Sequence, residues 1–182
     1  MTSIIKVNTF QDANGNALFS SDGSGNVTLS SGDLKSTPYF QAYLNTSQTG
    51  LSDGVDTKII FDSETFDADS VYDTSNGRFT PNQAGKYFVY AQGYLLGPGT
   101  NSVNTALMRM YKNGTQIARN IWYNGNEWVR YTSVTVQQIV DMNGSSDYIE
   151  IYAQQDTGGA NWEIHGNSIA STFFGAYKLI GA

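Results

Sequence analysis

The sequence predicts an all-β protein. Of its 182 residues, 40% are hydrophobic and 13% aromatic, and glycine occurs 19 times, a composition that favours strands and turns over helices. No segment keeps a helical period of apolar residues over three turns. From Tyr39 to Ile180, short apolar runs alternate with Gly, Asn and Ser, which indicates many short strands joined by turns.

Charge and length exclude several classes of protein. The net charge of −6 comes without a basic stripe, so we expect no binding to the phosphate backbone of nucleic acids. The chain has no cysteine, hence no disulfide framework and no thiolate zinc site. No apolar run is long enough to span a membrane, and the segment 1–8 lacks the apolar region of a secretory signal. We therefore expect synthesis in a cytoplasm without a signal peptide, a removed signal being the alternative.

Residues 1–37 differ from the rest of the chain. Asp12–Phe19 and Asp22–Leu29 echo each other, and each unit reads as a tight turn followed by a short strand. So little apolar surface cannot fold alone. The segment is predicted to be an anchor that becomes ordered on a partner or across chains, a disordered tail being the alternative. Pro38 marks the predicted boundary of a single domain over 38–182.

Two segments of this domain alternate between apolar and polar residues. Segments 106–111 and 148–154 each predict a strand with one face in the core and the other in water. The predicted core positions are Ala106, Met108, Met110, Ile149, Ile151 and Ala153. Glu150 and Gln154 fall on the face that is predicted to be wet.

Two other segments are apolar on both faces. In 87–91, Tyr87, Val89 and Ala91 alternate with Phe88 and Tyr90, and 173–180 shows the same property. A strand buried on both faces needs a second cover, and in a chain without helices another subunit is the simplest one. A loop of the same chain is the alternative. The pattern predicts an oligomer, but alternation does not say which face points toward the partner.

The spacing of six residues resembles the signature of the C1q domain. They are Phe61, Asp67, Tyr72, Phe79, Gly85 and Tyr87. Segment 39–43 resembles the opening strand of that family, Lys112–Gly114 its central turn, and 173–179 its closing strand. The chain departs from the signature at Val89 and Ala91, where the family has larger residues.

This resemblance covers about 38–181 and implies a ten-strand jelly roll of the C1q/tumour-necrosis-factor type that forms a homotrimer. Its inner sheet supplies the threefold interface. On this basis the predicted interface residues are Tyr87, Phe88, Val89, Tyr90, Phe173, Phe174 and Tyr177. Asp67 matches a signature position that we interpret as structural.

The N-terminal segment resembles the start of structural proteins of tailed bacteriophages. The resemblance lies in the run Ile5–Asp12 with Gly15 and Asn16, and in the Ser-Gly-Asn-Val-Thr echo at 24–28. It implies a part of the virion that is attached through residues 1–37.

Few residues suggest catalysis or metal binding. His165 is the only histidine, so a Ser-His-Asp arrangement would depend on it alone, and we interpret it as a polar loop residue. Acidic residues cluster at 53–73, but they lack a calcium-loop spacing and are interpreted as turn residues, with a weak calcium site as the alternative. These are Asp53, Asp56, Asp62, Glu64, Asp67, Asp69 and Asp73. We expect no cofactor.

Aromatic residues in predicted loops are the candidate ligand-binding residues, because aromatic faces stack on sugar rings and anchor protein interfaces. They are Trp122, Tyr123, Trp128 and Trp162. The alternative is that they pack in the core or between subunits.

These observations predict a non-enzymatic phage virion protein. It would be a trimeric decoration or fibre head on a capsid or tail, and it would bind host surface glycans or proteins multivalently. A secreted C1q-like lectin-type recognition protein is the first alternative, although neither a collagen-like nor a heptad stalk is present. A glycan hydrolase is the second, and it would need a pair among Glu127, Glu150 and Glu163.

Overall fold

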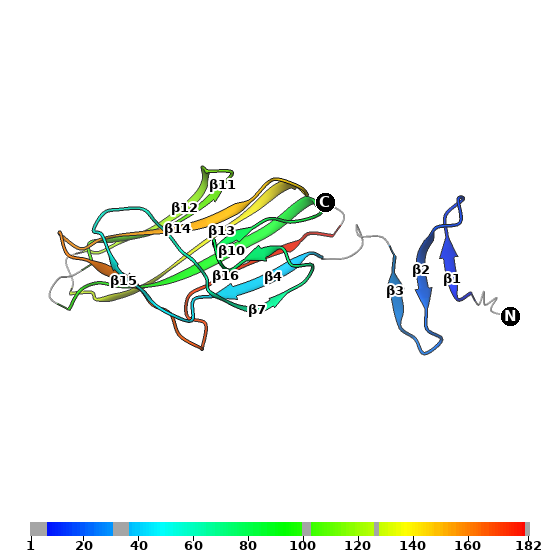
Figure 1. The fold of residues 1–182 in the computed structure, drawn as a ribbon, viewed down its shortest axis with the longest axis horizontal. Helices are drawn as coiled ribbons and strands as arrows, with labels where there is room; N and C mark the ends of the chain where they lie inside the picture. Colours follow the sequence, from blue (N-terminus) through cyan, green and yellow to red (C-terminus); the bar gives the residue numbers. More distant parts are fainter. Residues whose placement is uncertain (1–6, 31–36, 100–102, 126–127, 181–182) are drawn as a thin grey trace.

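The computed structural model describes residues 7–30, 37–99, 103–125 and 128–180, and this part of the chain is built from strands without a helix (Figure 1). It therefore holds no helix that could cross a membrane. The strands form three sheets, which we call the N-terminal sheet, sheet I and sheet II. The predicted all-β class is confirmed.

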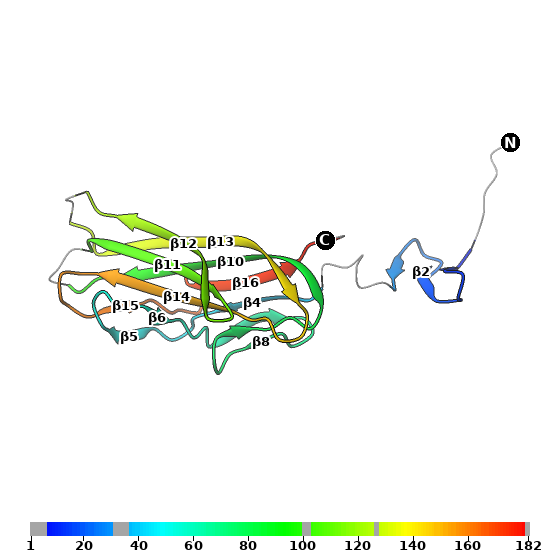
Figure 2. The same ribbon diagram turned by 90° about the horizontal axis from the view of Figure 1, so that it is seen from above.

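Sheets I and II form a sandwich whose strands lie roughly along one common axis (Figures 1 and 2). The strands of sheet I are β4 (Tyr39–Tyr43), β5 (Gln48–Leu51), β7 (Ser63–Asp67), β10 (Ala84–Leu96), β13 (Tyr131–Asn143), β15 (Trp162–Ile164) and β16 (Phe173–Lys178). Those of sheet II are β6 (Thr57–Lys58), β8 (Tyr72–Asp73), β9 (Arg78–Phe79), β11 (Thr105–Lys112), β12 (Thr115–Tyr123) and β14 (Ile149–Asp156).

The long strand β10 organises sheet I. One of its edges pairs antiparallel with β13 along its whole length, from Ala84 opposite Asn143 to Leu96 opposite Tyr131. Its other edge pairs with β16 and then with β15. Beyond β16 the sheet continues through β4 to β7. Residues of β10 and β16 thus lie side by side at the centre of the sheet.

The core lies between the two sheets. From β10, Tyr87, Val89, Ala91 and Leu95 point inward and are fully buried, as alternation requires. The six predicted core positions of β11 and β14 are also fully buried, so the predicted core face of both strands is confirmed. Phe40 stacks on Tyr72 and on Phe79, and its ring meets Phe174 edge to face, giving the core an aromatic end.

The N-terminal sheet consists of β1 (Thr9–Gln11), β2 (Ala17–Ser21) and β3 (Val27–Leu29), paired antiparallel in this order. The two sequence echoes form the same turn. Asp12 accepts hydrogen bonds from the backbone of Asn14 and Asn16 and from the side chain of Asn16. Asp22 does the same with Ser24 and Asn26. Each aspartate fixes one hairpin.

Candidate functional site

The outward face of sheet I carries four of the seven predicted interface residues. These are Phe88 and Tyr90 on β10, and Phe173 and Tyr177 on β16. The strand register places Phe88 directly opposite Tyr177, and their ring centroids lie 5.6 Å apart. Tyr90 lies 6.2 Å from Phe173 and 5.9 Å from Phe88. The four rings form one contiguous group.

Neighbouring strands extend this group across the sheet. Tyr39 of β4 is paired with Tyr177, Ile139 of β13 is paired with Phe88, and the ring of Phe66 on β7 meets Tyr39 edge to face at 5.6 Å. At the far end of β10, Tyr94 stacks on Tyr131. We call this surface the aromatic face. Its residues are Tyr39, Phe66, Phe88, Tyr90, Tyr94, Tyr131, Ile139, Phe173 and Tyr177.

The aromatic face remains open in the single chain. Tyr177 is 42% exposed, and Tyr39, Phe66, Tyr131 and Ile139 are exposed to a similar or greater degree. Aromatic side chains have large apolar surfaces, so covering them removes a large unfavourable contact with water. Scattered apolar residues are normal on a surface, but a contiguous group of this kind indicates an interaction site.

Gly175 fixes the position of Tyr90 on this face. A Cβ atom at Gly175 would lie 2.5 Å from Cζ and Oη of Tyr90, so the ring rests directly on the glycine backbone. Partial burial there raises the pKa of Tyr90, which keeps its hydroxyl neutral. Glycine at this position lets the aromatic ring lie flat against the sheet.

The other three predicted interface residues point into the core of the chain. Tyr87, Val89 and Phe174 are fully buried between the sheets, so they offer no surface to a partner. The hydroxyl of Tyr87 donates to the carbonyl of Gln83 at 2.8 Å, and burial raises the pKa of this tyrosine to about 12. The predicted interface therefore narrows to the four residues that alternate with them.

The outward face of sheet II carries paired charges beside one pair of rings, Tyr111 and Tyr152, whose centroids lie 4.6 Å apart. Glu150 is only 5% exposed, and its carboxylate accepts hydrogen bonds from Lys58 Nζ at 2.6 Å and from Arg78 Nη2 at 2.7 Å. Burial alone would raise the pKa of Glu150, but the bonds from these two cations outweigh it and hold the pKa below its usual value. The expectation of a wet face at Glu150 is wrong, because two cations from other strands cover it.

A second ion pair lies further along the same face. Arg109 pairs with Asp56 and donates to Gln154 at 2.7 Å, while Tyr111 donates to Asp56 at 3.2 Å. The charged groups of Glu150 and Arg109 thus find their partners within the chain.

The candidate ligand-binding aromatics separate into two pairs. Tyr123 is 69% exposed and Trp128 is 63% exposed, so both rings are accessible. Trp122 lies half-buried on β12, packed against the core. Trp162 is 2% exposed on β15 and donates its indole N–H to the carbonyl of Ser52 at 3.0 Å. The prediction that Trp122 and Trp162 lie in loops is wrong, because both belong to strands that place their indoles against the core.

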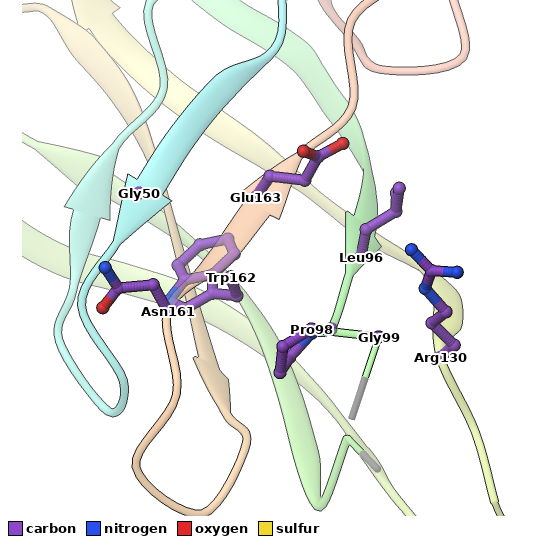
Figure 3. Close-up of a pocket in the computed structure, with 9 residues that line it drawn as sticks. Gly50, Leu96, Pro98, Gly99, Arg130, Asn161, Trp162 and Glu163 are labelled. Atoms are coloured by element: carbon purple, nitrogen blue, oxygen red, sulfur yellow. The ribbon is translucent and has the colours of Figure 1, made fainter. Parts of the chain in front are cut away.

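A cavity of about 230 Å³, which was not expected from the sequence, opens where β10 ends (Figure 3). Arg130, Asn161 and Glu163 supply its polar groups, and Trp162 lies beneath. Oε1 of Glu163 lies 3.8 Å from Nδ1 of His165. Among the residues that the structure describes, the lining of this cavity contains a single carboxylate, so two acids of a glycosidase are not found together there. Glu127 lies outside the described residues.

The acidic cluster of 53–73 is divided among separate turns. Asp53 accepts from the backbone of Thr157 and Gly159, and Asp62 from the backbone of Asn45 and Thr46. In the part of the chain that the structure describes, no three acidic or histidine side chains meet in a group that could hold a metal ion.

Asp67, at the signature position, accepts from the backbone of Val71 and Tyr72, which is the structural role expected from the sequence.

Three solved structures are similar to the chain. The Eiger tumour necrosis factor of S. frugiperda superposes with a TM-score of 0.56 at 14% identity, over 79% of this chain and 93% of that one. Murine APRIL at pH 5.0 gives a TM-score of 0.55 at 15% identity, over 78% of this chain and 100% of that one. The chain has the tumour-necrosis-factor-like jelly-roll fold. APRIL at pH 8.5 agrees, with a TM-score of 0.54 at 18% identity and the same coverage.

These identities establish the jelly-roll fold alone. No protein-family profile matches the sequence, and a search of curated proteins finds no relative. The predicted C1q/tumour-necrosis-factor-type sandwich is confirmed as a fold, and the function rests on the surfaces described above.

Proposed function

We propose that this chain is a non-enzymatic binding module that works as a homotrimer, with its subunits meeting through the aromatic face of sheet I. The observation that carries the proposal is the contiguous group around Phe88, Tyr90, Phe173 and Tyr177, which stays open in one chain. An obligate interface is expected to be apolar and rich in aromatic residues. The resemblance to the C1q/tumour-necrosis-factor fold implies three copies around one axis.

The trimer serves multivalent binding. Three copies on one axis raise the effective concentration of any weak contact, so that modest contacts sum to a useful avidity. Tyr123 and Trp128 are the exposed aromatics of the candidate set, and we propose that they contact host surface glycans or proteins.

We further propose that the module belongs to the virion of a tailed phage, where it decorates a capsid or forms a fibre head. Residues 1–37 would attach it to the capsid or tail. Support comes from the resemblance of this segment to phage structural proteins and from its organisation as a separate small sheet. A secreted lectin-type recognition protein would use the same trimer and the same exposed rings, and it remains the alternative.

The proposal makes no use of catalysis. Glu150, one of the three acids that a hydrolase could have used, is held by Lys58 and Arg78 and lowered in pKa, so it is unsuited to donate a proton at neutral pH. No cofactor is required for binding through aromatic surfaces.

Light scattering on the full-length chain tests the trimer. We expect a molar mass three times the chain mass of 19.9 kDa. Phe88→Asp places an unpaired carboxylate in the centre of the proposed interface. Burying this charge costs roughly 3–5 kcal/mol of association free energy per copy, so the variant should have the mass of one chain.

The matched control is Ile117→Asp, on the exposed outward side of β12 in sheet II, which should leave the mass unchanged. Circular dichroism of both variants verifies that the sandwich is intact. A single-chain mass for the wild type, or a trimeric mass for a folded Phe88→Asp, would overturn the proposal.

A further inference from the structure

The N-terminal sheet has two unlike faces. The register aligns Phe10 with Phe19 and Phe19 with Leu29, so these three side chains form a row across one face. The rings of Phe10 and Phe19 stack with centroids 4.4 Å apart. The corresponding row on the opposite face consists of Thr9, Ser20 and Thr28.

The apolar face is uncovered in the single chain. Phe10 is 45% exposed, and Val27, which shares the face with Leu29 by alternation, is more exposed still. On the opposite face, Leu18 is the apolar residue of the three strands. Strands this short bury too little surface to be stable alone, so the sheet needs cover over its apolar face.

The described residues of the N-terminal sheet carry no charged side chain on a strand face that would repel a second copy. Within residues 7–30, the charged side chains are Asp12 and Asp22. Both are held in the turns between strands by hydrogen bonds from Asn16 and Asn26. The strand faces are therefore free of charge, and identical copies of the sheet can approach one another without repulsion.

The attachment of the sheet links it to the aromatic face. After β3 the chain reaches Tyr39, which lies on the aromatic face opposite Tyr177. The connection, residues 30–38, spans at most about 30 Å when fully extended. In a trimer built on the aromatic face, the three N-terminal sheets would therefore be tethered close together, at an effective concentration on the order of millimolar.

We propose that the apolar faces of three N-terminal sheets pack against one another around the trimer axis and form a second apolar core. This inference rests on the trimer of the proposed function and identifies the occupant of the Phe10, Phe19 and Leu29 face as the same face of the other two copies. The face of Thr9, Ser20 and Thr28 then points outward and is left for attachment to the virion.

Single cysteines test this packing, because the chain has no cysteine of its own. Leu29→Cys places a thiol on the apolar face, and Thr28→Cys places one on the opposite face one residue away. After mild oxidation of the full-length variants, a denaturing gel should show several-fold more disulfide-linked dimer for Leu29→Cys than for Thr28→Cys. Equal linkage in both variants, or none in either, would overturn the packing.

Light scattering on the same two variants under reducing conditions separates the two ways to fail. If the mass is trimeric but the two variants form disulfide-linked dimers equally, the packing alone is refuted and the trimer stands. A single-chain mass refutes the proposed function, and this inference with it.

Hydrogen exchange gives a second readout that does not depend on cysteine chemistry. In the wild-type chain, the strand amides of 9–29 should be protected, and Phe19→Ser should remove this protection while sheets I and II keep theirs. Rapid exchange of 9–29 in a trimeric wild type would contradict the packing and would leave the apolar face to a foreign partner.

Discussion

The outward faces of sheets I and II differ in how their side chains are partnered. On sheet II, Glu150 has two cations within hydrogen-bonding distance, and Arg109 has Asp56, so these two charged groups are paired within the chain. On sheet I, the rings around Phe88 and Tyr177 contact one another, and Tyr177 is 42% exposed. The charges of one face are paired in a single chain, and we propose that the rings of the other are covered by a partner.

This difference indicates how the two surfaces are used. A face that carries ion pairs gains little by burial in an interface, since its pairs would have to be desolvated further. A face of rings gains about 25 cal/mol for each Å² of apolar surface that is removed from water. Assembly is therefore expected on sheet I, and sheet II is expected to face the solvent.

The largest effect on folding is expected from Glu150→Ala. Removing the carboxylate leaves Lys58 and Arg78 side by side without their anion, which we expect to lower the free energy of unfolding by about 2–3 kcal/mol. Chemical denaturation at fixed protein concentration measures this change. Glu163→Ala, which removes a partly exposed acid, is the control and should change the free energy by less than about 0.5 kcal/mol. Equal effects would mean that sheet II is not completed by its ion pairs.

The same carboxylate predicts a dependence on pH. Because the folded chain holds the pKa of Glu150 below its usual 4.5, its contribution is present above pH 4.5 and is lost as the pH falls through the folded value. Asp73 and Asp147, which also have lowered pKa values, act in the same direction. Denaturation between neutral and acidic pH should show a smaller loss of stability for Glu150→Gln than for the wild type. An identical loss would contradict the assignment.

Smaller effects are expected from alanine substitutions at two glycines of sheet I, one beside the aromatic face and one beside the core. A Cβ at Gly175 would strike the ring of Tyr90 on the aromatic face, whereas one at Gly93 would lie 2.6 Å from Sδ of Met108 in the core. Gly175→Ala is expected to tilt Tyr90 and weaken the trimer, and Gly93→Ala to lower the stability of the chain by overpacking, by about 1–3 kcal/mol. Sedimentation equilibrium and thermal unfolding distinguish the two effects. A Gly175→Ala trimer that associates like the wild type would argue against Tyr90 at the interface.

The smallest structural effect is expected at the exposed rings. Trp128→Ala should change neither the molar mass nor the free energy of unfolding by a measurable amount, because this side chain is largely in water. On a glycan array, the same variant should bind more weakly than the wild type. The control variant Ile169→Ala, which truncates an exposed side chain outside both proposed surfaces, should bind like the wild type. Unchanged glycan binding by Trp128→Ala would remove this ring from the proposed binding surface.

The sequence predicted the fold, and the apolar residues on both faces of β10 and β16 led to the hypothesis of an oligomer, which stays a prediction. It could not say which face is inward, since alternation is symmetric, and so Tyr87, Val89 and Phe174 were placed at the interface. Glu150 was misjudged because its cations lie 92 and 72 residues away in the sequence. Trp162 was misjudged for the same reason, since its partner Ser52 comes from a distant strand connection. Local patterns report periodicity, whereas cover by distant segments depends on the tertiary fold.

Hydroxyl-radical footprinting of the wild-type chain tests most directly whether the aromatic face is the contact between subunits. Oxidation of Tyr177 on the aromatic face is compared with that of Tyr123 at the end of sheet II, which are 42% and 69% exposed in a single chain. If the aromatic face is covered by another subunit, Tyr177 should be oxidised far more slowly than its single-chain exposure requires, while Tyr123 reacts freely. Oxidation of both tyrosines in proportion to these exposures would contradict the account.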